Sequence, residues 1–417
     1  MDNQKWCFKE NNEVHAAAAF TVRNILQAII GNIDETRTGK PMIHLGHGDP
    51  SVYPCFRTST IVEDALVESV RSTKFNCYAP GVGIDPARRA VADHLSKDLS
   101  YKLTADDIFL TVGANHAIEV LLKVLGQPGA NILFPTPNYP LYEAQSSLSP
   151  LEVRHFNLLP EKGWEVDIDG VKALADDKTV AIVLINPGNP CGNVFSIEHM
   201  QKVAETARQL GILVIADEVY AYQAFGEKPF IPMGVFGHIA PVLTLGTLSK
   251  RWIVPGWRFG WIAITDPNGI LHKTGIAGSI KSCLELTADP PTVIQGAVPH
   301  IMENTPESFF SDINKILKEA SDLFHERLKE ILPFVTSPHK PEGSMFAMVK
   351  INVSAFDDVI DDTDFCMKLA NEESMILFPG YAVGLKNWVR VSVAAEPKVL
   401  EDAIERMKAF CFRHARH

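Results

Sequence analysis

Residues 244–261 read TLGTLSKRWIVPGWRFGW and place Lys250 shortly after a strand-like apolar run. Two hydroxyl side chains, Thr247 and Ser249, stand close to this lysine, and Arg258 follows it by eight positions. A lysine amine becomes a nucleophile toward carbonyl groups when its surroundings favour the neutral form. Neighbouring hydroxyls and an arginine are suited to hold a phosphate. Taken alone, the segment also fits a strand end with a solvated lysine.

Short apolar runs alternate with helical patterns around this segment. The strand-like runs lie at 108–112, 131–134, 180–185, 212–216, 242–245 and 259–264, and helical patterns lie at 114–125 and 197–210. This alternation predicts an α/β fold around a mostly parallel sheet. Continuous apolar strands of this kind also predict helices on both faces of the sheet.

The sequence changes character after the break Asp289-Pro290-Pro291. A long helical pattern at 309–331 is followed by strand-like runs at 345–351 and 388–393, and by a final helical pattern at 397–410. Strands and helices grouped in this way predict a smaller α+β domain.

Composition and charge exclude several classes of protein. The 39 basic and 50 acidic residues give a net charge of −11, which argues against a general nucleic-acid binder. The seven cysteines form no CxxC pair or Cys/His cluster, so we expect neither a disulfide framework nor a metal site. The N-terminal segment lacks a secretory-signal pattern, and polar residues interrupt the apolar run at 15–30 too early for a membrane span. We therefore expect a cytoplasmic protein with no membrane partner and an amphipathic N-terminal arm.

Three further segments carry polar groups directly after strand-like runs, where open α/β sheets collect their ligands. ADEVY, at 216–220, offers the Asp217 carboxylate to a pyridine nitrogen and the Tyr220 hydroxyl as a donor. NPGNPCG, at 186–192, is a tight turn in which an asparagine side chain could donate to a phenolate oxygen. TVGANHAIEV, at 111–120, starts a helix whose free N–H groups suit a phosphate. Each also has an ordinary interpretation as a helix cap, a turn or an unliganded helix start.

Single residues elsewhere are weaker candidates. Tyr139, in FPTPNYPLY, could lie over a ring, and Tyr78 stands before a glycine-containing loop, although a plain surface loop or turn explains both. Arg390 lies within an apolar strand-like run, where burial is costly unless an anion pairs with it. We expect His47, in LGHGDP, to be structural rather than catalytic.

In this order along the chain, the segments resemble the class I aminotransferases, the fold-type I enzymes that use pyridoxal phosphate (PLP). The closest resemblance is to the plant-type tyrosine aminotransferase group, and it extends over about residues 43–410. The segments that carry it are GDPSVYPCFRTS, NCYAPGVGIDPARRAVADHL, INPGNPCGNV, ADEVY, SKRWIVPGWRFGW and PPTVIQGA. It implies a large domain with a mostly parallel seven-stranded sheet between helices, and a smaller α+β domain. The implied division is an N-terminal arm at 1–40, a small domain at 41–75 together with 305–417, and a large PLP-binding domain at 76–304.

The resemblance also implies a role for each candidate residue. Lys250 would be the catalytic residue, which bonds covalently to the cofactor and moves a proton to and from the substrate α-carbon. Asp217 would pair with the pyridine nitrogen, and Arg390 would bind the substrate α-carboxylate, with Gly48 and Asn189 lining the substrate pocket. Asn189 and Tyr220 would contact the ring hydroxyl of the cofactor, and Tyr139 would stack on its ring. The phosphate would be held by the partner subunit's Tyr78 and by five residues of the same chain: Ala114, Asn115, Thr247, Ser249 and Arg258.

The implied activity is a ping-pong transfer of the amino group from L-tyrosine, or another aromatic amino acid, to a 2-oxo acid such as 2-oxoglutarate. The products would be 4-hydroxyphenylpyruvate and glutamate, and a homodimer with shared active sites is implied as well. A carbon–sulfur lyase and a nicotianamine-type aminotransferase of the same family stay open as alternatives, because no motif separates them.

Two unrelated classes are disfavoured. A nucleotide-binding dehydrogenase would carry GxGxxG after a strand, and none follows the strand-like runs. A non-catalytic binding module would be expected to have lost Lys250 or Asp217, and both are present.

Overall fold

The larger part of the molecule is built on a sheet of eight strands, in a computed structural model that describes residues 6–33 and 39–416. The strand order is β2-β9-β8-β7-β6-β3-β4-β5. The strands are β2 (Ile108–Thr111), β3 (Asn131–Thr136), β4 (Glu152–Leu159), β5 (Glu165–Val166), β6 (Thr179–Ile185), β7 (Leu213–Asp217), β8 (Val242–Thr247) and β9 (Gly260–Thr265).

The sheet is mostly parallel, as predicted. Neighbours from β8 through β7, β6 and β3 to β4 run parallel, whereas β9 is antiparallel to β2 and β8, and β5 is antiparallel to β4. The α/β fold is therefore confirmed, but the described sheet has eight strands instead of the seven expected. The additional strand is β5, a two-residue return of the chain onto the end of β4, which is too short to leave a periodic pattern in the sequence.

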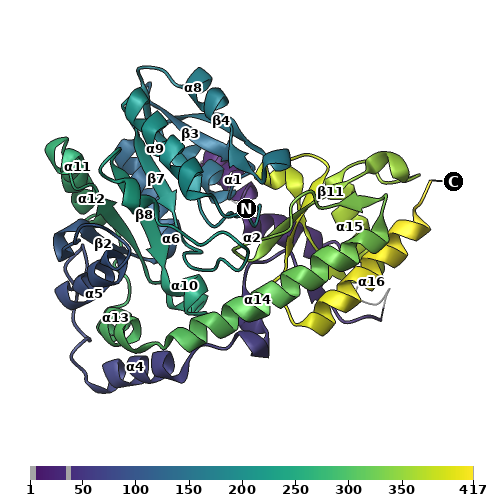
Figure 1. Cartoon of the computed structure of the whole chain (residues 1–417), viewed down its shortest axis with the longest axis horizontal. Helices are drawn as coiled ribbons and strands as arrows, with labels where there is room; N and C mark the ends of the chain where they lie inside the picture. The colour runs from purple at the N-terminus through teal and green to yellow at the C-terminus, as the bar shows by residue number, and fades with distance from the viewer. Residues whose placement is uncertain (1–5, 34–38, 417) are drawn as a thin grey trace.

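Helices cover both faces of this sheet (Figure 1). One face packs against α6 (Gly113–Leu125), α7 (Leu141–Ser146) and α12 (Ile276–Leu284). The opposite face packs against α8 (Ile168–Leu174), α9 (Ile197–Leu210), α4 (Thr60–Arg71), α5 (Asp85–Ser96) and α13 (Thr292–Asn304). Alternate residues of one strand serve the two faces: in β6, Val183 joins the first cluster, and Ile182 and Leu184 join the second. The central strands β6 and β7 are largely apolar because both of their faces are covered, whereas β4, near the edge of the sheet, carries exposed polar residues such as Glu152 and Asn157.

The smaller part contains a four-stranded antiparallel sheet in the order β10-β11-β14-β13. Its strands are β10 (Val335–Thr336), β11 (Phe346–Ile351), β13 (Phe378–Pro379) and β14 (Trp388–Ser392). A separate parallel pair joins β1 (Ile43–His44) to β12 (Met375–Ile376), so an early and a late segment of the sequence lie side by side here. One hydrophobic cluster unites these strands with α15 (Asp362–Glu373) and α16 (Pro397–Arg413). The predicted α+β character of this part is confirmed.

Two further helical segments connect the parts. Helix α14 (Glu307–Leu328) places Phe310 in a cluster of the large part and Phe324 in the core of the small part (Figure 1). The N-terminal arm forms α1 (Asn12–Ala19) and α2 (Val22–Ile30), and α2 buries Ile25, Leu26 and Ile29 in the small-part core.

The proposed domain limits stay a prediction. Residues 1–5 and 34–38 of the predicted arm at 1–40 lie outside the described residues. Helix α4, which falls within the segment 41–75, packs against α13 in a cluster of the large sheet.

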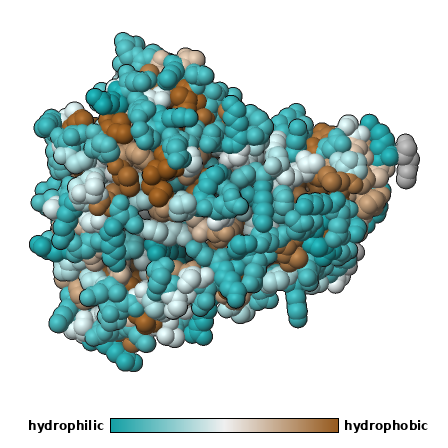
Figure 2. Space-filling model, in the orientation of Figure 1, coloured by the Kyte–Doolittle hydropathy of each residue, from teal (hydrophilic) through white to brown (hydrophobic). Residues whose placement is uncertain are grey.

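The face shown in Figure 2 is mostly hydrophilic, and its hydrophobic residues gather in separate patches. Elsewhere in the chain, Phe8, Tyr78 and Leu286 are large hydrophobic side chains that are 76%, 100% and 86% exposed. Among the described ranges, no helix has both the length and the apolar character that crossing a membrane requires.

The aromatic core of the small part gives a stability prediction. Phe365, on α15, is 0% exposed and stands edge-on to Phe410, with ring centroids 5.2 Å apart. We expect Phe365→Ala to lower the free energy of unfolding by about 3–5 kcal/mol, because it leaves a cavity. The control, Ile360→Ala, removes a side chain from a residue that is 75% exposed and should cost less than about 0.5 kcal/mol. Urea unfolding at one protein concentration measures both, and equal losses would contradict the prediction.

Candidate active site

Polar segments at the carboxyl ends of three neighbouring strands meet at one edge of the large sheet. Strands β6, β7 and β8 are adjacent and parallel. The turn at 186–192 follows β6, Asp217 ends β7, and Lys250 lies in the short helix α10 (Leu248–Arg251) directly after β8. Such an edge is where open α/β sheets bind their ligands. Three segments identified from the sequence therefore lie side by side.

The Lys250 side chain is half-buried. Its Nζ donates a hydrogen bond to the carbonyl oxygen of Gly48, which lies 202 residues earlier in the chain. Burial lowers the pKa of Lys250 to about 8; Asp49 opposes this shift, and Arg390 and Arg258 add to it. At pH 7 about a tenth of this amine is therefore neutral and nucleophilic, far more than for an ordinary lysine.

The Asp217 carboxylate is buried at the end of β7, with 5% of the residue exposed. The Tyr142 hydroxyl donates to its Oδ2 at 3.0 Å, and the Val219 N–H donates to its Oδ1 at 3.3 Å. Burial nevertheless raises the pKa of Asp217 to about 6. Among the described residues, no cationic side chain contributes to this pKa, although a buried carboxylate is stabilised by a cationic partner.

Arg390 is the buried cation of the site, with 1% of the residue exposed. Its Nη1 donates to Asn189 Oδ1 at 3.1 Å and its Nη2 to the Gly46 carbonyl at 3.0 Å, whereas its buried Nε has no partner among the described residues. The guanidinium carbon lies 4.3 and 4.4 Å from the ring centroids of Phe346 and Phe378. Burial lowers the pKa of Arg390 to about 10. A positive charge held without a carboxylate partner is suited to bind an anion.

A second cationic group lies at the start of α6. A Cβ on Gly113 would come within 2.3 Å of Arg258 Nη2, and Gly113 has a φ of +72°, so glycine leaves the room that this approach needs. The hydroxyl oxygens of Thr247 and Ser249 are 2.8 Å apart in the turn after β8. The first turn of α6 adds N–H groups that the helix leaves free, at Ala114 and Asn115. Together these donors suit a phosphate.

Two tyrosines border the same region. The Tyr139 hydroxyl donates to Asn115 Oδ1 at 3.4 Å, which ties the aromatic loop to the start of α6. Tyr220 is 4% exposed, and its ring centroid lies 6.0 Å from Lys250 Nζ. Burial raises the pKa of both phenols, so both hydroxyls stay protonated and act as donors near neutral pH.

Gly48 and Tyr78 occupy contrasting positions. A Cβ on Gly48 would come within 2.6 Å of the Phe346 ring, so glycine allows the backbone to pass close to this ring, and the Gly48 carbonyl accepts the hydrogen bond from Lys250. The Tyr78 side chain is 100% exposed, in contrast to the buried Asp217 and Arg390 of the site. Its expected contact across a dimer interface stays a prediction.

Sequence reasoning missed the groups that support the charged residues. Tyr142 binds Asp217, Gly46 binds Arg390, and the rings of Phe346 and Phe378 enclose the guanidinium. Tyr142 stands three positions after Tyr139 in PTPNYPLY, which is the one local signal that could have suggested it. The two phenylalanines have the pattern of ordinary core residues.

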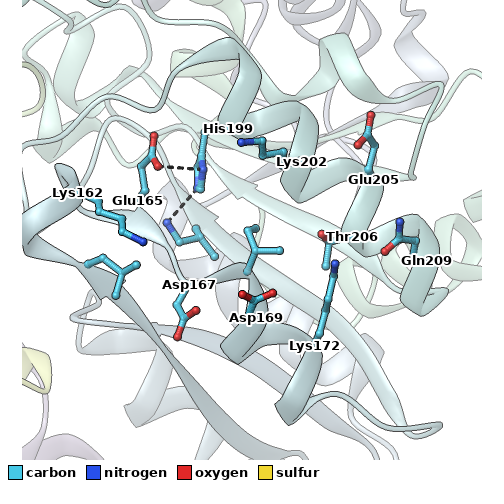
Figure 3. Close-up of a pocket in the computed structure, with 13 residues that line it drawn as sticks. Lys162, Glu165, Asp167, Asp169, Lys172, His199, Lys202, Glu205, Thr206 and Gln209 are labelled. Atoms are coloured by element: carbon cyan, nitrogen blue, oxygen red, sulfur yellow. Dashed lines mark hydrogen bonds and ion pairs between the residues drawn. The ribbon is translucent and has the colours of Figure 1, made fainter.

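Another hollow lies between α8 and α9, away from these residues (Figure 3). His199 is one of the residues that line it, and its Nε2 accepts a hydrogen bond from the Val166 N–H at 2.9 Å. Lysines and carboxylates line it together, including Lys162, Lys172, Lys202, Glu165, Asp167 and Asp169. This mixture favours neither an anion nor a cation, so we place the active site at the sheet edge.

The buried groups at the sheet edge fit PLP, whose aldehyde, pyridine nitrogen and phosphate need different partners. Lys250 offers an amine of lowered pKa, Asp217 offers a buried carboxylate with no cationic partner among the described residues, and Arg258 offers a cation beside the start of α6. Fold and site together define a PLP-dependent enzyme of fold type I.

Comparisons with known proteins agree. Residues 40–407 match the family described as aminotransferase class I and II. The chain is 55% identical to nicotianamine aminotransferase 1 of Oryza sativa subsp. japonica, over 96% of this chain and 80% of that protein. It is 52% identical to the S-alkyl-thiohydroximate lyase SUR1 of Arabidopsis thaliana, over 99% of this chain and 88% of that protein. The crystal structure of tyrosine aminotransferase from Leishmania infantum matches with a TM-score of 0.89 at 29% identity, covering 99% of this chain and all of that one.

The chain therefore belongs to the aminotransferase class I and II family. It is an aminotransferase, and its cofactor is PLP. The names of these relatives differ in substrate, and that of SUR1 names a lyase, so family membership fixes the cofactor and leaves the amino acid to be inferred from the site.

The lowered pKa of Lys250 predicts how the apoenzyme takes up PLP as pH changes. Only the neutral amine attacks the aldehyde, so the rate of reconstitution should rise about tenfold per pH unit and level off above about pH 8. For an ordinary lysine the rise would continue to about pH 10. Stopped-flow absorbance of the visible band measures the rate, and Lys250→Ala should show no covalent band. A rise that continues past pH 10 would contradict the assignment.

Proposed function

We propose that this chain is an aromatic amino acid aminotransferase that acts on L-tyrosine and passes the amino group to a 2-oxo acid such as 2-oxoglutarate. The products are 4-hydroxyphenylpyruvate and glutamate. The observation that carries the proposal is Arg390, a buried cation that has no carboxylate partner among the described residues. It donates a hydrogen bond to Gly46, two residues before the carbonyl that Lys250 contacts. A substrate α-carboxylate on Arg390 would bring the α-carbon toward Lys250.

The surroundings of Arg390 support an aromatic substrate. Phe346 and Phe378 flank the guanidinium, and Tyr220 stands edge-on to Phe346 with ring centroids 5.9 Å apart. Aromatic pairs contribute about 0.5–1.5 kcal/mol beyond the area they bury. The likeness to the tyrosine aminotransferase of Leishmania infantum over the whole chain supports the same substrate.

The chain's own residues supply the proton transfers and the orientation. PLP, when bound, withdraws electrons from the substrate α-carbon. Lys250 Nζ takes the α-proton and returns it, and its pKa near neutrality suits both steps. Asp217 holds a proton on the pyridine nitrogen. Asn189 Oδ1 is engaged by Arg390, which leaves its Nδ2 to donate to the ring hydroxyl together with the Tyr220 hydroxyl.

The phosphate and the dimer form the second part of the proposal. Arg258, Thr247, Ser249 and the first turn of α6 hold the phosphate, and Tyr139 stacks on the ring. The full exposure of Tyr78 is explained if a second copy of the chain covers this side chain, and the Tyr78 hydroxyl then donates a hydrogen bond to the phosphate bound in that second copy. The exposed Leu286 lies beside the same loop, since a Cβ on Gly81 would be 3.3 Å from the Glu285 side chain. The cytoplasmic location stays a prediction.

A second reaction is favoured by one specific observation, the 52% identity with the lyase SUR1. The same lysine would remove the α-proton, after which a sulfur leaving group on the β-carbon would depart instead of the nitrogen being transferred. The 55% identity with nicotianamine aminotransferase 1 similarly supports nicotianamine as an alternative amino donor.

An assay of the products separates these alternatives. We expect the purified holoenzyme, with L-tyrosine and 2-oxoglutarate, to form equal amounts of 4-hydroxyphenylpyruvate and glutamate. Chromatography measures both products, and parallel reactions contain nicotianamine or a cysteine S-conjugate. Release of thiol and pyruvate without amino transfer from tyrosine would refute the proposal in favour of a lyase. A much higher kcat/KM for nicotianamine would refute tyrosine as the main donor.

Replacement of Arg390 tests the carboxylate site. Loss of a buried ionic partner costs several kcal/mol, so Arg390→Gln should lower kcat/KM for tyrosine about a hundredfold to a thousandfold. Arg390→Lys keeps the charge without the paired donors and should recover part of the loss. The visible band of the bound cofactor should persist in both variants, because Arg390 is not placed at the phosphate or the ring nitrogen. Activity equal to that of the wild-type enzyme in Arg390→Gln would contradict the role.

A further inference from the structure

A mainly apolar groove of about 590 Å³ lies beside the catalytic segment. One wall is helix α2, which presents Arg23, Leu26, Gln27 and Ile30 to it. Their spacing of three and four residues puts these side chains on one face of the helix. The other walls are residues 41–44 and the first turns of α16.

The groove borders the active site through three consecutive residues. Gly46 accepts a hydrogen bond from Arg390 Nη2 at 3.0 Å, and Gly48 accepts one from Lys250 Nζ. His47, between them, lines the groove. Burial lowers the pKa of His47, and the charges of Lys250, Arg390 and Arg23 lower it further, against the opposing effect of Asp49. Two cationic residues, Arg23 and Lys398, line the groove, and Arg23 is the one whose charge acts on His47.

The carboxylates of the groove are already engaged, whereas Arg23 is not. Asp402 Oδ2 lies 2.6 Å from Arg406 Nη2, and Asp49 Oδ1 accepts from the Ser51 N–H at 3.0 Å. Neither an ion pair nor a side-chain hydrogen bond engages Arg23 within the described part of the chain. A guanidinium that lines an apolar groove without a carboxylate partner among the described residues is complementary to an anionic group on an aliphatic chain.

We propose that Arg23 binds the distal carboxylate of a dicarboxylic substrate, the acceptor 2-oxo acid of the 2-oxoglutarate type. The substrate's α-carboxylate lies on Arg390, and its methylene groups lie along Leu26. The inference rests on the proposed function and deepens it by assigning one residue of the N-terminal arm to the choice of acceptor. The same groove offers its apolar walls to the ring of tyrosine when that substrate is bound.

The test compares two acceptors that differ only in the distal carboxylate, 2-oxoglutarate and 2-oxopentanoate, with L-tyrosine as donor and the intact holoenzyme. Loss of a hydrogen-bonded charge in Arg23→Gln should lower kcat/KM for 2-oxoglutarate about tenfold to a hundredfold and change that for 2-oxopentanoate less than about twofold. Arg23→Lys should recover part of the loss. The control, Arg208→Gln, removes an exposed arginine of α9 and should change neither value.

A binding measurement keeps this proposal separate from the proposed function. Glutarate and pentanoate cannot react, and each is titrated against the holoenzyme while the absorbance of the cofactor is followed. Arg23→Gln should weaken the binding of glutarate alone. Equal losses for both ligands, or no loss for glutarate, would overturn the role of Arg23 whether or not the enzyme uses tyrosine. Failure of the wild-type enzyme to transaminate tyrosine, with selective loss of glutarate binding, would overturn only the proposed donor.

Discussion

The site depends on the burial of three ionisable groups for which no ion pair forms among the described residues. Lys250, Asp217 and Arg390 lie in low-dielectric surroundings, where burial lowers the pKa of Lys250 and Arg390 and raises the pKa of Asp217. Such burial is costly, and the hydrophobic clusters around the site have to offset it. The three groups match an aldehyde, a pyridine nitrogen and a carboxylate, so bound cofactor and substrate would relieve an imbalance that the folded chain retains.

Each of these groups reaches the site on a different element. Asp217 and Lys250 follow neighbouring strands of the large sheet, whereas Arg390 lies on β14 of the small one. The segment from Gly46 to Gly48 joins them, because its carbonyls accept hydrogen bonds from both Arg390 and Lys250. The site therefore forms only when both parts of the molecule are folded and held together, and α14 packs into the cores of both.

The elements that could be predicted from the sequence are those with a regular apolar pattern and the site residues that carry a charge. The runs at 180–185 and 242–245 fall within β6 and β8 and could be predicted because strands buried on both faces are mostly apolar, although β8 also buries Thr244. Strands of two residues, such as β1 and β12, have no period to detect and depend on distant partners. Within the site, the charged residues stood out, whereas Tyr142, Phe346 and Phe378 have the pattern of core residues. Their contacts join positions far apart in the chain, which local patterns do not record.

The pairing of the N-terminal segment with the last strands also sets the order of events during synthesis. Arg390 contacts a carbonyl that left the ribosome 344 residues earlier, and β1 waits for β12 in the same way. At elongation rates of about 5–20 residues per second, that delay is about 20–70 s. Throughout this interval the apolar face of α2 has no finished core to pack against, which makes this nascent segment a suitable binding site for chaperones.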